Sequence, residues 1–387
     1  MRYDAIVIGV GGMGSAALYH LARRGARVLG LEQFDVAHDR GSSHGLSRII
    51  RLAYYEHPSY VPLLRRSYEL WRDLEHETGR QLLHITGSID ASRRDEAVFA
   101  GSLRSCELHD LAHEVLSSEE LSRRFPGYRL PDDIVALFQP EGGFLEPESC
   151  VRAYVDAALV HGAEVRTNVR VQGLEAGAEK VRVRTSDDEL EARTVVVSAG
   201  AWTSKLLPDL GSLAVPERQV VAWFQPLTPS LFRTDDFPVF NLLVDDRRYY
   251  GFPAHGVPGM KIGLYHHLGE VTDPDAQRRE CDADDERPLR EGVARCFPEA
   301  NGPLLQMQPC MFTNSPDEHF IIDRLEPDSP VVVAAGFSGH GFKFCSVVGE
   351  VLADLALEGG TRHDIGMFGL SRFQGGHRTG PTAHSRG

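Results

Sequence analysis

The first 31 residues combine two short apolar runs with a stretch of helical periodicity between them. Residues 3–8 (YDAIVI) are mostly apolar and include β-branched side chains, which predicts a strand buried in a parallel sheet. Small and apolar residues recur at helical spacing over 13–24, and Gly25 is a suitable helix end. A second buried strand is predicted over 28–31. Strand, helix and strand in this order indicate a βαβ unit.

The same kind of sequence returns further along the chain. Apolar runs at 194–200 (TVVVSAG) and 330–335 (PVVVAA) predict two more buried strands, and a helix over 347–357 follows the second. The periodicity also predicts helices over 60–78 and 151–162 and strands within 164–176 and 180–186.

Residues 216–310 have a different pattern, which is typical of antiparallel strands. A hairpin is expected at 245–248, and one helix is expected near 288–296, where Pro288 would suit the first helical turn.

Nucleotide-type α/β sequence therefore occurs in three separated pieces. We expect an α/β chain of two domains, with a Rossmann-type domain formed by residues 1–80, 146–215 and 311–372. An antiparallel-sheet domain would be formed by residues 81–145 and 216–310. Residues 373–387 are polar and glycine-rich, which predicts a disordered tail.

Composition and charge narrow the class of protein. The chain is 42% apolar and 25% charged, as globular proteins are, and its net charge of −14 disfavours nucleic acid and anionic membranes as partners. The first residues lack the features of a secretory signal, and no apolar run approaches the roughly 20 residues of a membrane span. Six scattered cysteines suggest reduced thiols, so a cytoplasmic protein is expected.

Residues 9–14 (GVGGMG) match the G-x-G-x-x-G fingerprint of dinucleotide-binding proteins, directly after a predicted strand. Gly9 would permit the tight turn, Gly11 would let the backbone approach a pyrophosphate, and Gly14 would let helix and strand pack closely. Glu32 lies at the end of the second strand, where a carboxylate accepts hydrogen bonds from ribose. This fingerprint does not separate FAD from NAD.

Other segments are ambiguous when taken alone. Arg48 and Arg51 could bind a carboxylate or stack on a flat ring, or they could be two surface arginines. Residues 336–343 (GFSGHGFK) follow a buried strand and could contact a ligand or simply pack a loop end. Cys310 is by default an inert buried thiol, and Lys261 by default a solvated strand lysine.

Histidines give no metal signal in the sequence. His266, His267, His319 and His340 do not share the spacing of metal ligands, so no metal site is expected.

Four longer strings carry a family resemblance: SHGLSRIIRLAYYE, YYGFPAHGVPGMKIG, CMFTNSPDEHFIID and AGFSGHGFKF. With them, the chain resembles the monomeric sarcosine oxidase and N-methyltryptophan oxidase family of flavoenzymes from about residue 3 to residue 370. The resemblance implies a glutathione-reductase-type FAD domain, an antiparallel-sheet substrate domain, and FAD attached covalently through Cys310.

The resemblance also implies roles for particular residues. Arg48 would pack against the flavin, while Arg51 and Lys343 would bind the substrate carboxylate. Tyr250 would belong to the substrate pocket, and the buried ammonium of Lys261 would stabilise negative charge developing on dioxygen. The expected cofactor-binding residues are Gly9, Gly11, Gly12, Met13, Gly14, Glu32, Ser43, His44, Arg48, Val171, Ala199, Gly200, Trp202, Cys310, Met311, Gly336, Gly339, Gly341 and Lys343.

One position departs from the family pattern. Family members usually have a histidine four residues beyond the lysine, but here that position is Tyr265 and the histidine is His266. A one-residue shift in a strand turns a side chain to the other face. Either a bulge restores His266 to the pocket, or Tyr265 reshapes the pocket.

These features predict an FAD-dependent oxidase that acts on a small amine carrying a carboxylate. The substrate would be an N-methyl amino acid or a cyclic imino acid. Hydride transfer from the substrate to flavin would be followed by reduction of dioxygen to hydrogen peroxide. The imine product would then hydrolyse in water. Three alternatives stay open: an FAD-dependent dehydrogenase with another electron acceptor, a non-catalytic nucleotide-binding protein, and an NAD-dependent dehydrogenase that shares only the Gly9 to Glu32 unit.

Overall fold

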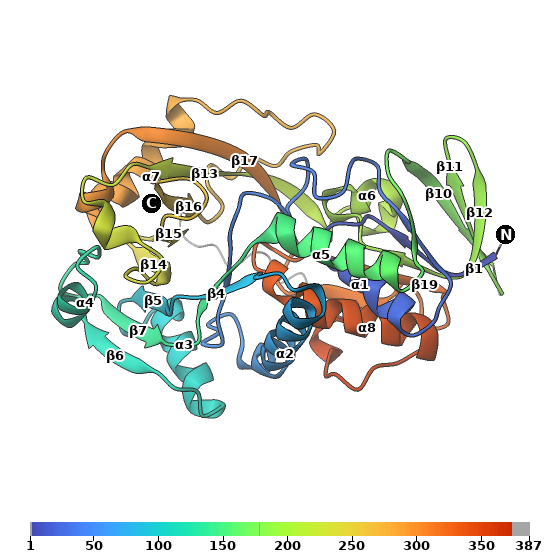
Figure 1. Cartoon of the computed structure of the whole chain (residues 1–387), viewed down its shortest axis with the longest axis horizontal. Helices are drawn as coiled ribbons and strands as arrows, with labels where there is room; N and C mark the ends of the chain where they lie inside the picture. Colours follow the sequence, from blue (N-terminus) through green and yellow to red (C-terminus); the bar gives the residue numbers. More distant parts are fainter. Residues whose placement is uncertain (1, 178, 374–387) are drawn as a thin grey trace. The chain divides into compact units, whose positions relative to one another are not determined.

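The computed structural model describes residues 2–177 and 179–373, and the chain forms two compact units (Figure 1). Unit 1 comprises Met1–Ser43, Ser149–Glu217 and Met311–Gly387, and unit 2 comprises His44–Glu148 and Arg218–Cys310. Residues 374–387 of the expected tail lie outside the described residues. None of the helices within 2–177 and 179–373 is long and apolar enough to cross a membrane.

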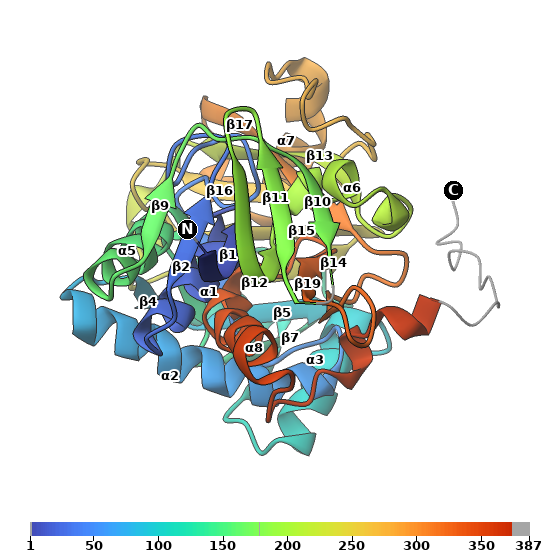
Figure 2. The same ribbon diagram turned by 90° about the vertical axis from the view of Figure 1, so that its right-hand side faces the viewer.

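Parallel strands form the centre of the sheet in unit 1, in the order β9-β2-β1-β12-β19. β18 pairs antiparallel with β19, and β10 and β11 extend β12 as an antiparallel meander (Figure 2). The strands are β1 (Arg2–Ile8), β2 (Val28–Leu31), β9 (Glu164–Arg166), β10 (Val171–Ala176), β11 (Val181–Thr185), β12 (Glu189–Val197), β18 (Ile321–Arg324) and β19 (Val331–Ala335). The central strands are continuous apolar runs because helices and loops cover both faces of a parallel sheet.

Two helices of unit 1 pack closely beside this sheet, α1 (Gly12–Arg23) and α8 (Cys345–Glu358) (Figures 1 and 2). Their close approach depends on small residues, since a Cβ placed on Gly349 would lie 2.5 Å from the Cβ of Ala16. Unit 1 also contains α5 (Pro147–Val160), apart from its first two residues, and the short α6 (Thr203–Leu206). The predicted βαβ unit and α/β fold class are confirmed.

Unit 2 is built on a second sheet, in the order β17-β13-β16-β15-β14-β5-β7-β6, and on a small sheet in the order β3-β8-β4. Its strands are β3 (Arg48–Ile50), β4 (Leu83–Ile85), β5 (Ser88–Ser92), β6 (Glu114–Ser117), β7 (Val135–Gln139), β8 (Gly143–Leu145), β14 (Val239–Val244), β15 (Arg247–Phe252) and β16 (Met260–Leu264). The edge strand β17 (Leu304–Asn314) and its neighbour β13 (Val215–Phe224) each include residues of unit 1. Its helices are α2 (Val61–Thr78), α3 (Ala97–Leu108), α4 (Ser118–Arg124) and α7 (Ala283–Cys296).

Eight short 3-10 turns complete the secondary structure of the described residues: Pro58–Tyr60, Gly200–Trp202, Pro208–Leu210, Pro229–Phe232, Pro298–Ala300, Phe342–Phe344, Gly366–Phe368 and Leu370–Phe373.

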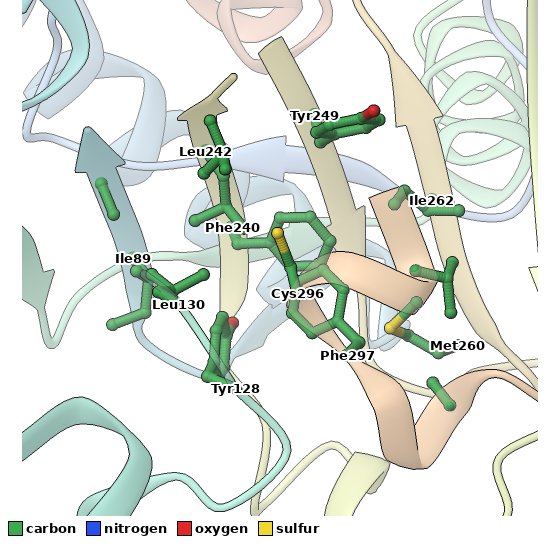
Figure 3. Packing of buried hydrophobic residues seen from close by; sticks show 14 of the residues in the cluster. Ile89, Tyr128, Leu130, Phe240, Leu242, Tyr249, Met260, Ile262, Cys296 and Phe297 are labelled. Carbon is green, nitrogen blue, oxygen red and sulfur yellow. The ribbon is translucent and has the colours of Figure 1, made fainter. Parts of the chain in front are cut away.

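The two faces of the unit 2 sheet have different roles, because successive side chains of a strand point to opposite faces. On one face, Met260, Ile262 and Tyr249 join a large apolar core beneath α7, in which the rings of Phe240 and Phe297 lie 4.5 Å apart (Figure 3). On the other face lie the alternate residues of the same strands, among them Lys261 and Tyr250. Burial of the first face therefore fixes the pairing register of these strands, and with it the face on which Lys261 and Tyr250 lie.

The helix expected near 288–296 begins five residues earlier, at Ala283, so the prediction that Pro288 occupies the first turn was wrong. Asp282 and Asp285 form a capping box that satisfies the free N–H groups of the first turn. Asp285 is also buried against the guanidinium of Arg218, with two hydrogen bonds of 2.7 and 2.9 Å. These contacts fix the start of α7 in spite of the proline within it.

Residues 44–80, expected in the nucleotide-binding domain, belong to unit 2 by their contacts. β3 pairs with β8, the hydroxyl of Tyr68 donates to the carbonyl of Glu141, and the side chain of Arg65 donates to the carbonyl of His109. Pairing between distant segments therefore moves the boundary from residue 80 to Ser43, and also places 146–148 in unit 2.

Candidate active site

Four loops leave the same edge of the unit 1 sheet. They follow β1, β2, β12 and β19, which are neighbouring parallel strands, so their carboxyl ends lie side by side. The loops carry the glycine turn, Glu32, residues 199–202 and residues 336–343. Ligands of open α/β sheets bind at this edge.

The glycine turn has the backbone geometry that the fingerprint predicts. Gly9 has a φ of +86°, and a Cβ on Gly14 would clash with the carbonyl oxygen of Gly9. Gly11 is the N-cap of α1 and provides no capping side chain, and the first turn has no acidic residue. A Cβ on Gly11 would meet only the Oγ of Ser43, 3.8 Å away, while that Oγ accepts a hydrogen bond from the N–H of Gly12. This arrangement suits a phosphate.

Glu32 follows β2 directly and is buried. One carboxylate oxygen accepts from the N–H of Val10 and the other from the N–H of Phe34. The carboxylate is therefore held beside the glycine turn, as ribose recognition in a dinucleotide site requires.

The other expected cofactor residues of unit 1 are distributed over this edge. Trp202 and Met311 pack in one apolar cluster with Ala199 and Phe34. The remaining members are Met13 at the start of α1, Val171 at the start of β10, Gly200 in a 3-10 turn, and Gly336, Gly339, Gly341 and Lys343 after β19. Lys343 is buried and its ammonium donates to the carbonyl of His340, 2.8 Å away.

Lys261 of unit 2 is a buried lysine whose hydrogen-bond partners are all uncharged oxygens. The Nζ donates to the carbonyl oxygens of Gly45 and Ser47 at 2.6 and 3.0 Å, and to the Oγ of Ser47 at 3.1 Å. It also lies 4.5 Å from the ring centroid of Phe252. Burial, and then the positive charge of Arg48, hold the pKa of Lys261 well below its ordinary value.

A strained turn aims those carbonyl groups at the lysine. Gly45 and Leu46 have φ values of +96° and +69°, and the N–H of Ser47 donates to the carbonyl of Gly45. A leucine rarely adopts this conformation. Glu148 stabilises it, since its carboxylate accepts from the N–H of Gly45 at 2.6 Å and from that of Leu46 at 3.3 Å.

Cys310 is buried on β17, and its carbonyl accepts a hydrogen bond from the side chain of Gln277. Burial raises the pKa of its thiol, whereas the charges of Arg48 and Lys261 act to lower it. Both cations therefore lie where they favour the thiolate, the reactive form of cysteine. Tyr250 lies on the apolar cluster that contains Phe252, and burial raises the pKa of its phenol.

Arg51 is already bound by carboxylates within unit 2. It donates to both carboxylate oxygens of Glu56 at 3.2 and 3.0 Å and to the carbonyl of Ala53, and its Nε lies 3.4 Å from Asp90. Although burial opposes the charged form, Asp90 and Glu56 raise the pKa of Arg51 well above its ordinary value. A substrate carboxylate would have to exchange with Glu56 or share the guanidinium with it.

The structure also decides the geometry of Tyr265 and His266. β16 ends at Leu264 and pairs with β15 without a bulge, so both residues lie in the following turn, where His266 has a φ of +60°. The ring of Tyr265 lies 3.2 Å from the guanidinium carbon of Arg248. Of the two alternatives for this position, β16 therefore has no bulge that would restore His266, and Tyr265 is held against Arg248.

Several residues of this region were not predicted from the sequence: Glu56, Asp90, Glu148, Asn241, Arg248 and Gln277. Asp90 is the acidic residue in the middle of β5 (SIDAS), and all five residues of that strand are buried. An acid inside such a short strand is the one feature of the sequence that could have pointed to it. His44, which was predicted, is buried directly after Ser43.

The glycine turn and the sheet edge define a dinucleotide-binding oxidoreductase, and comparison with known proteins agrees. The family described as FAD dependent oxidoreductase matches residues 4–355. The chain therefore belongs to this family, which decides between FAD and NAD.

Closer relatives name the group within the family. Monomeric sarcosine oxidase of Streptomyces avermitilis is 45% identical, over 96% of this chain and 98% of that protein. N-methyl-L-tryptophan oxidase of Yersinia pestis is 36% identical, over 97% of this chain and all of that protein. The solved structure of NikD, an unusual amino acid oxidase essential for nikkomycin biosynthesis, superposes with a TM-score of 0.82 at 27% identity, covering 95% of this chain and 97% of that one.

The chain is thus a member of the sarcosine oxidase and N-methyltryptophan oxidase group and an FAD-dependent amine oxidoreductase. The predicted family, fold class and enzyme class are confirmed.

The pairing of Asp90 with Arg51 predicts a pH-dependent stability. Burial raises the pKa of Asp90 to about 6, although Arg51 and Asn241 oppose the shift. The folded protein therefore keeps the proton on Asp90 up to a higher pH than the unfolded chain does, and Asp90 is ionised at neutral pH. Relative to Asp90→Asn, wild-type protein should lose unfolding free energy on the order of 3 kcal/mol as pH rises from 4 to 7.

Urea denaturation at each pH measures this difference. Exposed Asp133 serves as the control, since the difference in unfolding free energy between wild type and Asp133→Asn should show no such loss over that range. A constant difference between Asp90→Asn and wild type would contradict the assignment.

Proposed function

We propose that this protein oxidises secondary amino acids, either N-methyl amino acids or cyclic imino acids, with dioxygen as the electron acceptor. The observation that carries the proposal is the buried ammonium of Lys261, bound by the carbonyl groups of Gly45 and Ser47 beside Arg48 and Cys310. The names of its oxidase relatives support the substrate class.

The residues at the edge of unit 1 fit FAD. The glycine turn and the N-terminus of α1 would bind the pyrophosphate, and Glu32 the adenosine ribose. When bound, FAD would take two electrons and a proton from the C–H bond beside the amine nitrogen, and these, together with the proton that the amine nitrogen releases as the imine forms, would reduce dioxygen to hydrogen peroxide.

Cys310 would hold the flavin permanently through a thioether to its Sγ. Burial raises the pKa of the thiol, and the neighbouring charges of Arg48 and Lys261 act in the opposite direction, toward the thiolate that is the nucleophile. Arg48 would also pack against the flavin ring.

Arg51 and Lys343 would each contribute a positive charge to the substrate carboxylate. In the present arrangement Glu56 occupies the Nη2 group of Arg51, so the substrate carboxylate would replace that of Glu56. Asp90 would stay bound on the other side of Arg51 and keep the guanidinium in place. Such positioning supplies a large share of catalysis.

Lys261 would stabilise the negative charge that develops on dioxygen. A fixed cation in a dry site does this more strongly than a hydrated one. Tyr250 would contact the substrate, and Tyr265, held by Arg248, would set the size of the pocket in place of His266.

We also propose that the protein works in a reducing compartment, the cytoplasm. None of the six cysteines, all of them among the described residues, is paired in a disulfide, which supports this location.

The proposed reaction predicts turnover of sarcosine, N-methyl amino acids or proline-like imino acids, with one hydrogen peroxide formed per amine consumed. An oxygen electrode and a peroxidase-coupled assay measure the two quantities. The matching primary amino acid, which lacks the N-methyl group, is the control and should react at least about tenfold more slowly. A pocket that fits one methyl group discriminates by roughly this factor against a substrate without it. Amine oxidation that proceeds with an artificial dye but not with dioxygen would instead establish the dehydrogenase alternative.

The proposed covalent link predicts that the yellow colour of the purified protein stays with the pellet after acid precipitation. In Cys310→Ala the flavin should pass into the supernatant, because no other bond would hold it. Cys281→Ala, which changes a half-buried thiol outside the proposed link, should behave like wild type. Release of flavin from the wild-type protein would refute the link and leave the FAD assignment intact.

A further inference from the structure

Three side chains that are far apart in the sequence meet in unit 2. His84 lies in the middle of β4, Glu146 follows β8, and His255 lies between β15 and β16. The Nε2 atoms of His84 and His255 lie 3.0 and 2.8 Å from the same oxygen of Glu146. The intervals of 62 and 109 residues explain why spacing in the sequence gives no signal.

The three groups have the geometry of a metal-binding triad. One ligand atom from each residue lies within 4.8 Å of the other two. Two imidazole nitrogens and a carboxylate oxygen form a donor set used by zinc, at bond lengths of about 2.0–2.2 Å. Ligand atoms around one tetrahedral ion lie roughly 3.3 Å apart, so the separations of 2.8 and 3.0 Å need only small adjustment.

The surrounding residues orient these ligands. The ring of Phe144 stacks on His84 at 4.7 Å and lies 4.8 Å from the ring of His255. The N–H of Glu146 donates to the carbonyl of Leu82, which fixes the backbone beside the carboxylate.

The triad differs from the other histidine–carboxylate contacts of the described residues. His363 with Glu350 and His267 with Asp285 each bring one imidazole to one carboxylate. Among the described residues, three such ligands lie together only at His84, Glu146 and His255. These side chains are 15–26% exposed, which leaves access for an ion and for a water molecule as fourth ligand.

We propose that His84, Glu146 and His255 bind a divalent metal ion of the zinc type. The ion would join β4, the segment after β8 and the loop before β16. Two residues beyond Glu146, Glu148 binds the strained turn that carries Gly45. The site thus secures the backbone that supports Lys261, and it does not depend on the proposed oxidase reaction.

Titration of the purified, chelator-treated holoenzyme with zinc chloride tests the proposal. Calorimetry should show one zinc ion per chain with a dissociation constant of about 1 µM or below, and bound zinc should raise the melting temperature. Glu146→Gln and His255→Gln should each weaken binding about a hundredfold, because each removes a ligand. His363→Gln removes a histidine of similar exposure that has only one carboxylate partner, and it should bind zinc like wild type.

Flavin absorbance and circular dichroism establish that each variant is folded, and the two ligand variants are independent of each other. Failure of the wild-type protein to take up zinc below about 1 mM would overturn the proposal. Equal affinity in wild type, Glu146→Gln and His255→Gln would overturn it as well. A melting temperature that falls in Glu146→Gln, without zinc uptake by wild type, would assign the cluster to hydrogen bonding alone.

Discussion

The burial of one positive charge governs the organisation of unit 2. The ammonium of Lys261 makes its three hydrogen bonds to uncharged oxygens, and desolvation of a charge is costly unless such donors are fully satisfied. The strained turn at Gly45 and Leu46 satisfies them, and Glu148 in turn stabilises the strain. Burial of the opposite face of β16 against α7 fixes the register of the lysine. A change in any of these parts would displace the charge.

The same principle extends to Arg51. Its guanidinium is buried between Glu56 and Asp90, so the charge is neutralised within the protein before any substrate arrives. On the proposed role of Arg51, binding of a carboxylate substrate would be an exchange between two anions rather than the capture of a free cation. Such exchange would lower affinity but make a carboxylate necessary, which is a basis for specificity.

The sequence predicted local features better than long-range ones. The strands and helices of unit 1 were predictable because buried parallel strands are continuous apolar runs and a glycine turn has a recognisable spacing. The start of α7, the boundary at Ser43 and the turn containing His266 were not, because each depends on partners elsewhere: Arg218 for Asp285, β8 for β3, and Arg248 for Tyr265. The roles of Glu148 and Asp90 were hidden for the same reason, since no local pattern shows what a buried carboxylate binds.

The most direct test of this account is the rate at which the reduced holoenzyme reacts with dioxygen as a function of pH. Because the pKa of Lys261 is lowered, the rate constant should be high at low pH and should fall as the ammonium loses its proton, at a pH well below the ordinary value of 10.5. Lys261→Met should react about a hundredfold more slowly, with no such fall. A wild-type profile that is flat up to pH 10 and equal in rate to that of Lys261→Met would contradict the account.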